Sequence, residues 1–205
     1  MGIGAYVGDP AQPVNHFRRY HHLRRYHHRM APAATTSLTV PEYDALYGNQ
    51  PGWEYWFGEA KRKPVPTYLH GLLQILLGEL LNRAGYIASV ESDMKIAPDW
   101  HPRPDVVGVL QITGKYVTGP EDVVVFEVLS EGDPIAEKCQ HYTEINIQQV
   151  FVFDPEAKTI TNWDGAKLVP VQDVQLANGV TITGATIWSD FAKRQKQTPP
   201  ASSVI

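Results

Sequence analysis

The chain has 205 residues, a net charge of −4 at pH 7, 43% hydrophobic residues and 20% charged residues, a composition typical of a globular protein long enough for one domain with a core. Cys139 is the only cysteine, which excludes an internal disulfide, and no apolar run reaches the roughly 18 residues of a membrane-spanning helix. The N-terminus lacks the apolar core and small-residue cleavage site of a secretory signal, so we expect a cytoplasmic protein with no membrane partner.

The charge is divided unevenly between the N-terminal segment and the rest of the chain. Residues 1–35 contain five arginines and one aspartate, a net charge of +4, which leaves −8 for the remainder. An acidic body lacks the surplus of Lys and Arg with which a broad basic face binds phosphates. Contact with nucleic acid would therefore be local, assisted by a metal ion or supplied by the N-terminal segment.

Residues 1–36 form a His- and Arg-rich tail, in which Arg-Arg-Tyr-His-His occurs at 18–22 and again at 24–28. Its few aliphatic residues leave little to bury, so we predict disorder. Three interpretations stay open: an extension without function, a nucleic-acid-binding arm that uses Arg charge and Tyr stacking, and an adventitious metal-binding tract. Met30 as the true start is a further alternative. An ordered domain is predicted at 37–197 and a disordered C-terminus at 198–205.

Three elements are predicted at the start of this domain. A short helix at 39–46 has Pro41 in its first turn. The aromatic run at 53–61 predicts a hairpin. Leucines at three- and four-residue spacing predict the strongest helix of the chain at 67–84, and Gly85 stands where a C-terminal glycine belongs.

The remaining domain reads mainly as strands. Helices are predicted at about 134–146 and at 189–196, and Asp164-Gly165 is a hairpin signal. A helix, then strands, then a helix between two further strands favours an α/β or α+β layer arrangement. The predicted strands lie at about 86–91, 105–112, 123–129, 149–154, 158–163 and 166–171, with an edge strand at 180–183.

Two acidic residues accompany consecutive apolar strands. Asp105 precedes a Val-rich run, and Glu127 lies inside another one 22 residues later, a separation that suits adjacent strands. A carboxylate in a sheet core is costly unless a cation, a proton or a hydrogen-bond donor compensates it. Mg²⁺ commonly uses one or two carboxylates while it contacts a substrate phosphate. We therefore predict that Asp105 and Glu127 bind Mg²⁺ or Mn²⁺ for hydrolysis of a nucleic-acid backbone.

A positive charge near such a metal would orient the attacking water or stabilise the developing oxyanion. Lys138 lies about one turn into the helix predicted from Pro134, and Tyr142 follows four residues later. Residues at this spacing share a helix face. Both side chains are therefore predicted to face the two carboxylates.

Further motifs join these residues in a recognisable order. Together they resemble the Uma-type restriction endonuclease family of the PD-(D/E)-x-K nuclease superfamily, over residues 38–195. The resemblance implies a restriction-endonuclease-like fold, with a central mixed sheet flanked by helices, a divalent-metal phosphodiesterase site and a homodimer. The motifs that carry it are Trp53–Glu59, Pro66–His70, Pro104-Asp105, Glu127–Ser130, Glu137-Lys138 with Tyr142, and Val150–Pro155.

The resemblance also implies roles for individual residues. In the superfamily a lysine usually lies two residues after the second acid, but Leu129 stands there, so the role of that lysine passes to Lys138 on the helix. The implied site consists of the metal ligands Asp105 and Glu127, the third acid Glu54, the catalytic lysine Lys138, and the candidate substrate-binding residues His70 and Tyr142.

We predict a Mg²⁺-dependent DNA endonuclease. One alternative is a nuclease-like domain that binds nucleic acid or a protein without cleaving it, and another is a metal-dependent hydrolase of a smaller phosphodiester. For single residues the alternatives are a solvated Lys138, an exposed hairpin charge at Glu54, a surface or internally paired His70 and a purely packing role for Tyr142.

Overall fold

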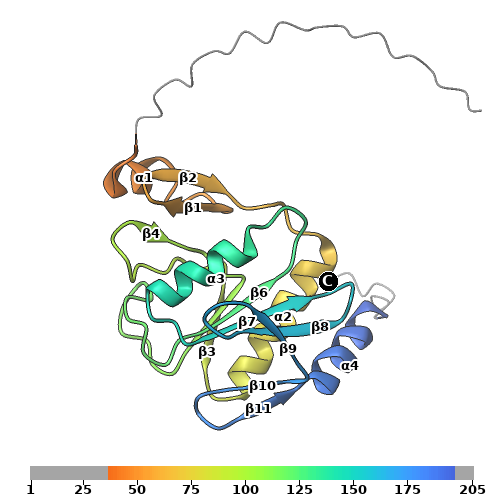
Figure 1. Ribbon diagram of the computed structural model, residues 1–205. Helices are drawn as coiled ribbons and strands as arrows, with labels where there is room; N and C mark the ends of the chain where they lie inside the picture. The colour runs from red at the N-terminus through yellow and green to blue at the C-terminus, as the bar shows by residue number, and fades with distance from the viewer. Residues whose placement is uncertain (1–36, 197–205) are drawn as a thin grey trace, which may run out of the picture. The chain divides into compact units, whose positions relative to one another are not determined.

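A six-stranded mixed sheet lies at the centre of residues 37–196, the part of the chain that the computed structural model describes (Figure 1). The predictions for 1–36 and 198–205 lie outside the described residues. Neighbouring strands are antiparallel except for β6 and β7, which are parallel and joined by helix α3 (Ile135–Glu144). In order across the sheet, the strands are β3 (Ile87–Val90), β5 (Val106–Val109), β6 (Val124–Val128), β7 (Gln149–Asp154), β8 (Thr159–Trp163) and β9 (Leu168–Val171).

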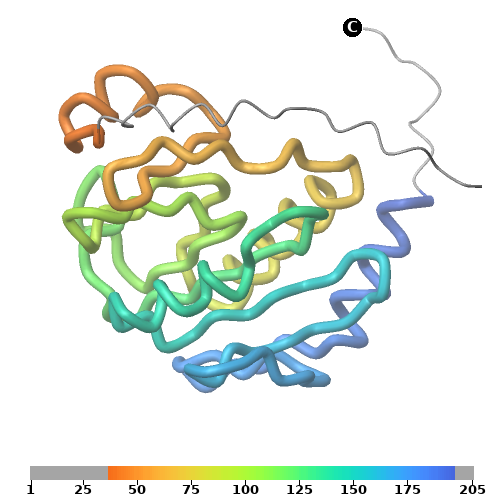
Figure 2. Tube along the Cα trace, turned by 45° about the horizontal axis from the view of Figure 1, so that its top comes forward, coloured from red at the N-terminus to blue at the C-terminus, as the bar shows by residue number. Residues whose placement is uncertain are grey.

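The sheet is buried on both faces because successive side chains of its strands alternate between two apolar clusters. Val124 and Phe126 of β6 belong to the cluster that contains Leu77 of helix α2 (Tyr68–Arg83) and residues of helix α4 (Gly184–Gln195). Val125 belongs to the cluster that contains Tyr142 of α3. Helix α4 lies on the side of the domain away from the β1–β2 hairpin (Figures 1 and 2).

Helix α2 begins and ends where the leucine spacing predicted. Thr67 is its N-cap, and the Thr67 Oγ1 atom accepts a 3.2 Å hydrogen bond from the backbone N–H of His70. Gly85 follows the helix with a φ of +90°, a left-handed conformation that glycine adopts without steric cost. The helix therefore holds His70 at a fixed point beside the end of the sheet.

The predicted aromatic hairpin is also present. Strands β1 (Trp53–Trp56) and β2 (Glu59–Arg62) are joined by the two residues Phe57-Gly58, both with positive φ, as in a type I′ turn. β1 also pairs with β4 (Trp100–His101), a short strand that the sequence did not predict. Helix α1 (Val40–Leu46) precedes the hairpin, as expected.

Three boundaries differ from the sequence predictions. β11 (Thr181–Thr183) pairs with β10 (Asp173–Gln175) in a separate two-stranded sheet, so it does not extend the main sheet as an edge strand. α4 begins at Gly184 instead of residue 189, because Thr183 is its N-cap and accepts a hydrogen bond from the backbone N–H of Thr186. The Gln172 carbonyl oxygen lies where a Cβ atom of residue 184 would be, so glycine alone fits there. The strand predicted at 105–112 ends at Val109.

These layers confirm the predicted α+β fold, a mixed sheet with helices on both faces. Across residues 37–196, no helix combines the length and the apolar character that crossing a membrane requires. Three of the buried charged residues lie on or beside β5, β6 and α3, namely Asp105, Glu127 and Lys138.

Candidate active site

Strand pairing brings Asp105 and Glu127 together at one end of the sheet. β5 and β6 are antiparallel with Val106 opposite Phe126, so the next position of the ladder places Asp105 opposite Glu127. Side chains at opposite positions point to the same face of a sheet. The Asp105 Oδ2 atom also accepts a 2.7 Å hydrogen bond from the backbone N–H of Val128. The two acids thus have the adjacent-strand placement that the sequence predicted.

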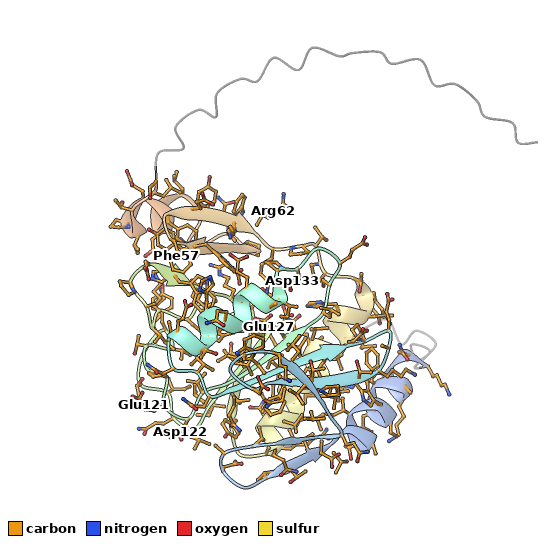
Figure 3. All side chains as sticks on the ribbon, in the orientation of Figure 1. Phe57, Arg62, Glu121, Asp122, Glu127 and Asp133 are labelled. Carbon is orange, nitrogen blue, oxygen red and sulfur yellow. The ribbon has the colours of Figure 1, made fainter. Side chains whose placement is uncertain are left out.

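Glu127 is the centre of a buried group of charges, here called the Glu127 cluster (Glu54, Glu127, Lys138 and Tyr142). The Glu127 Oε1 atom lies 2.9 Å from Lys138 Nζ and accepts a 2.6 Å hydrogen bond from the Tyr142 hydroxyl. Lys138 Nζ is also 3.5 Å from Glu54 Oε1. All four side chains are buried, and Figure 3 shows Glu127 inside the fold beside α3. The sequence predicted that Tyr142 faces the carboxylates and binds the substrate. In the structure its hydroxyl contacts Glu127.

The second carboxylate oxygen of Glu127 is in a different situation. Oε2 is buried and has no hydrogen-bond partner within residues 37–196. Burial raises the pKa of Glu127 to about 7, although the Lys138 ammonium acts in the opposite direction. A buried polar atom without a partner is costly, so Oε2 indicates a position where a cation or a proton would be bound.

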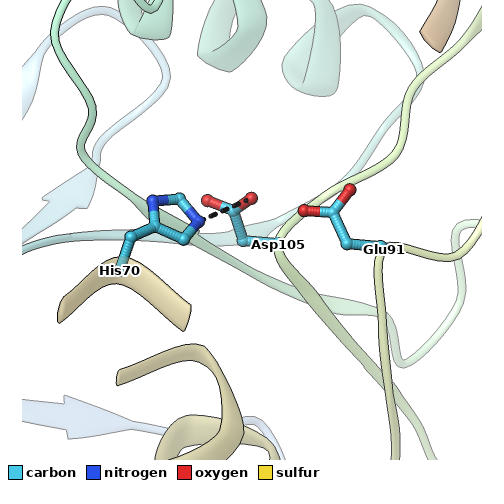
Figure 4. A group of neighbouring side chains, drawn as sticks. All are labelled: His70, Glu91 and Asp105. Atoms are coloured by element: carbon cyan, nitrogen blue, oxygen red, sulfur yellow. Dashed lines mark ion pairs between the residues drawn. The ribbon is translucent and has the colours of Figure 1, made fainter. Parts of the chain in front are cut away.

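Asp105 faces two basic groups, Lys63 and His70; Figure 4 shows His70 beside it. Its Oδ1 atom is 2.9 Å from Lys63 Nζ and 3.3 Å from His70 Nε2. Burial opposes ionisation of Asp105, but the His70 imidazole and the Lys63 ammonium hold its pKa well below the usual range. His70 Nδ1 lies 2.9 Å from Ser130 Oγ, which orients the ring. Despite its proximity to Asp105, His70 Nε2 makes no aligned hydrogen bond to any described residue.

A cavity of about 280 Å³ opens beside Asp105. Its walls include Lys63, His70, Glu91 and Asp133. Within the described residues, the members of the Glu127 cluster are not part of this wall. Asp105 and His70 therefore line the cavity, whereas the Glu127 cluster does not. A larger cavity of about 620 Å³ is formed mainly by the loop at 110–123 and includes none of the predicted site residues.

The sequence matches a known protein family. One family model, described as "Uma2: Putative restriction endonuclease", matches residues 40–184, more than half of the chain. The chain belongs to the Uma2 family. The resemblance drawn from the sequence motifs is thereby confirmed. A search of curated proteins finds no match.

Solved structures support the fold. The crystal structure of a "putative nuclease belonging to DUF820" from Anabaena variabilis has a TM-score of 0.62 and 17% sequence identity, and the match covers 75% of this chain and 99% of that one. At this identity the likeness concerns the fold alone. Together with the family match, it confirms the restriction-endonuclease-like fold. A cryo-EM structure of a DrdV–DNA complex matches 58% of this chain and 10% of that one, with 13% identity and a TM-score of 0.32, too low to support an argument.

Sequence reasoning missed three site residues of this Uma2-family chain: Lys63, Gln74 and Glu91. Glu91 directly follows β3 and lies opposite Asp105, because the β3–β5 pairing continues to that position. Gln74 donates hydrogen bonds to Glu91 Oε1 at 3.1 Å and to the Asp105 carbonyl oxygen at 2.7 Å. The available signal was the pair His70 and Gln74, two polar residues four apart on the buried side of a leucine-rich helix.

The donor set fits a divalent cation. His70, Glu91 and Asp105 each offer one ligand atom, and these atoms lie within 4.8 Å of one another. Glu127, the second ligand predicted from the sequence, is not a member of this three-residue group. Its Oε2 atom and His70 Nε2 are buried and lack hydrogen-bond partners in the described part of the chain. Carboxylate oxygens suit Mg²⁺ and Mn²⁺, and an imidazole ligand suits Mn²⁺ better than Mg²⁺.

The charge balance of the site points the same way. Across the described residues, the carboxyl groups that interact electrostatically with the two site lysines outnumber them by five to two. Burial raises the pKa of Glu91 and of Asp133, while the neighbouring lysines lower it. A divalent cation would compensate this surplus of negative charge. The five groups are Glu54, Glu91, Asp105, Glu127 and Asp133, and the two lysines are Lys63 and Lys138.

Proposed function

We propose that this Uma2-family protein is a divalent-metal-dependent nuclease that hydrolyses phosphodiester bonds inside DNA strands. The observations that carry the proposal are the ligand atoms of His70, Glu91 and Asp105 that meet beside the cavity and the buried Glu127 Oε2 atom, which lacks a partner among the described residues. Family membership supports nuclease function in general terms. The family match does not specify the DNA substrate, the endonucleolytic mode or the ion. We propose all three, with Mg²⁺ or Mn²⁺ as the ion.

In this proposal Asp105 and Glu127 hold the ion, with His70 and Glu91 as further candidate ligands. When bound, the ion would supply charge neutralisation at the scissile phosphate and a lower pKa for the attacking water. Asp105 is suited to this role because its lowered pKa keeps it ionised over the physiological pH range. His70 lines the cavity, where a substrate phosphate would lie.

Lys138, Glu54 and Tyr142 act through Glu127 in this proposal. Lys138 and Tyr142 both contact Glu127 Oε1, an arrangement that leaves Oε2 as the free ligand atom. Glu54 in turn accepts a 3.0 Å hydrogen bond from Trp56 Nε1, which fixes its carboxylate beside Lys138. Their contribution is to position a carboxylate in a water-poor environment, where electrostatic interactions are strong.

Plasmid nicking tests the proposal. The parent protein should nick supercoiled DNA with Mg²⁺ or Mn²⁺ and lose this activity in EDTA. Asp105→Asn and Glu127→Gln keep the shape of each side chain but remove its charge, and each should lower the rate by at least about 100-fold. The control is Lys167→Met, an exposed substitution on the β8–β9 turn, which should nick like the parent. Nicking that persists in EDTA, or in both site variants, would refute the metal-dependent mechanism.

A nuclease-like domain that binds nucleic acid without cleaving it is the second candidate. Leu129 in the usual lysine position and the complete burial of Lys138 favour it. Binding of labelled DNA without nicking in either metal would support this candidate. Hydrolysis of bis(p-nitrophenyl) phosphate without plasmid nicking would instead support a smaller phosphodiester as substrate.

We also propose a homodimer in the cytoplasm. The homodimer rests on the family resemblance, and the cytoplasmic location is consistent with Cys139 as the single cysteine. Sedimentation equilibrium on the full chain tests the assembly, since a monomer mass at micromolar concentration would contradict it. Fractionation of the producing cells tests the location.

A further inference from the structure

Four oxygen atoms from three residues surround the Lys63 ammonium. Lys63 Nζ is 2.7 Å from the Arg103 carbonyl oxygen, 2.9 Å from Asp105 Oδ1, and 2.9 Å from each of the two Glu91 carboxylate oxygens. An ammonium has three protons to donate, so the two Glu91 oxygen atoms share one proton while the Arg103 carbonyl oxygen and Asp105 Oδ1 take the other two. Carboxylate oxygens together with a backbone carbonyl oxygen are also the ligand set of a hard cation.

Two of the residues that surround the Lys63 ammonium are also candidate metal ligands. Asp105 and Glu91 belong to the three-residue group whose ligand atoms lie within 4.8 Å of one another. Asp105 Oδ1 is in contact with Lys63 Nζ and lies 3.3 Å from His70 Nε2. A divalent ion bound to this group would therefore compete with the Lys63 ammonium for the same oxygen atoms.

We propose that the Lys63 ammonium is a built-in cation, which means that it occupies the metal site when no metal ion is bound. A divalent ion displaces the ammonium toward the cavity, where the ammonium contacts the substrate phosphate. This inference rests on the proposed function for the identity of the substrate. In the metal-free protein Lys63 compensates the charges of Glu91 and Asp105. In the metal-bound protein the same ammonium is released for substrate binding.

The position of Lys63 in the chain permits this movement. The residue lies in the connection between β2 and α2, and its backbone N–H donates a 2.9 Å hydrogen bond to the Gly52 carbonyl oxygen, which holds the main chain in place. Its four-carbon side chain is part of the cavity wall. Rotation of the side chain alone would therefore bring the ammonium into the cavity.

Lys138 is poorly placed for this role. Its side chain is 1% exposed and, as far as the described residues show, it does not line the cavity beside Asp105. Leu129 occupies the position where the superfamily usually has its lysine. Of these positions, Lys63 is the one from which an ammonium can reach both Asp105 and the cavity.

The experiment measures Mn²⁺ affinity of the full chain by isothermal titration calorimetry. Lys63→Met removes the competing charge and should bind Mn²⁺ at least about tenfold more tightly than the parent. Lys63→Arg keeps the charge and should bind like the parent. Lys167→Met is the control with the same change in net charge on an exposed turn. Asp105→Asn provides the background from the histidine-rich N-terminal segment, which is common to all variants.

Nicking assays on the same samples provide the second measurement. Lys63→Met should combine tighter Mn²⁺ binding with at least about tenfold slower nicking, because the phosphate-contacting charge is missing. If Lys63→Met does not fold, Lys63→Gln replaces it, since its amide can still donate to the Arg103 carbonyl oxygen.

Equal Mn²⁺ affinity in the parent and in the uncharged variant would refute the proposed competition between Mn²⁺ and the Lys63 ammonium. The absence of Mn²⁺ binding above the Asp105→Asn background would refute it as well. Failure of the parent to nick DNA would refute the proposed nuclease function and the phosphate contact of Lys63. The affinity difference between the parent and Lys63→Met would still test the built-in cation separately.

Discussion

Replacing Lys138 by methionine tests whether charge holds the Glu127 cluster together. Lys138 Nζ lies 2.9 Å from Glu127 Oε1 and 3.5 Å from Glu54 Oε1, so its removal leaves two buried carboxylates without their ammonium. Removing one partner of a buried pair costs about 3–5 kcal/mol, and we expect Lys138→Met to fall at the upper end. Glu127→Gln should cost less, because Lys138 keeps Glu54 as a partner and the amide oxygen can still accept the hydrogen bond from Tyr142.

The cost of Lys138→Met should depend on pH. A carboxyl group whose folded pKa lies above its unfolded value contributes stability that is complete below the unfolded pKa and is lost as pH rises through the folded pKa. For Glu127, the shift from 4.5 to about 7 corresponds to roughly 3 kcal/mol lost over that interval. Without Lys138 the pKa of Glu127 rises further, so the additional loss falls above pH 7. Lys138→Met should therefore be more destabilising at pH 8 than at pH 5.5.

Urea unfolding followed by tryptophan fluorescence measures these free energies for the parent, the two single variants and the double variant. The double variant should cost about 1–3 kcal/mol less than the sum of the single variants, because each single variant already breaks the pair. Lys167→Met, on an exposed turn, should change stability by no more than about 0.5 kcal/mol. Additivity of the single variants, or a Lys138→Met effect that does not change with pH, would refute the reasoning.

Three further predictions concern the fold around the site. Burial raises the pKa of Cys139 to about 12, so the native protein should not react with Ellman's reagent at pH 8, and rapid colour development before urea is added would contradict this. Leu77 is fully buried between α2 and the sheet, so Leu77→Ala should lower the unfolding free energy by about 2–5 kcal/mol; a loss below about 1 kcal/mol would contradict the packing. Thr67→Ala removes the N-cap of α2 and should cost about 1 kcal/mol, whereas Thr67→Ser should stay close to the parent in the same urea titration.

Much of the fold followed from the spacing of apolar residues. The leucines of α2 and the Val-rich runs of β5, β6 and β7 repeat over enough positions to identify each element. The sequence predicted the neighbouring pairs β5–β6 and β8–β9, but the full strand order was not available, because it depends on pairing between distant segments. β4 and β10 have two and three residues, too few for any periodicity. Helix α4 begins with Gly184, a residue of low helix propensity, so its first turn gave no signal.

The residues of the candidate site were also predictable only in part. Asp105 and Glu127 were visible in the sequence because carboxylates beside apolar strands require compensation. Glu91 and Lys63 were not visible, because a Glu after a strand and a Lys before a proline resemble ordinary solvated residues. Their approach to Asp105 depends on the β3–β5 register and on the path of the connection between β2 and α2, and neither follows from local sequence.

Leu129 gives a physical reason for a site with two lysines. It packs at the edge of the cluster on the α3 face of the sheet, so the position that usually carries the lysine of a PD-(D/E)-x-K site contributes apolar contacts here. Two roles of the superfamily lysine must then be taken by other residues: compensation of the buried second acid and contact with the substrate. Lys138 takes the first role from α3, in contact with Glu127. The second role requires access to the cavity, where Lys63 lies. Under this division of roles, Lys138→Met should act mainly on stability and Lys63→Met mainly on Mn²⁺ affinity and nicking.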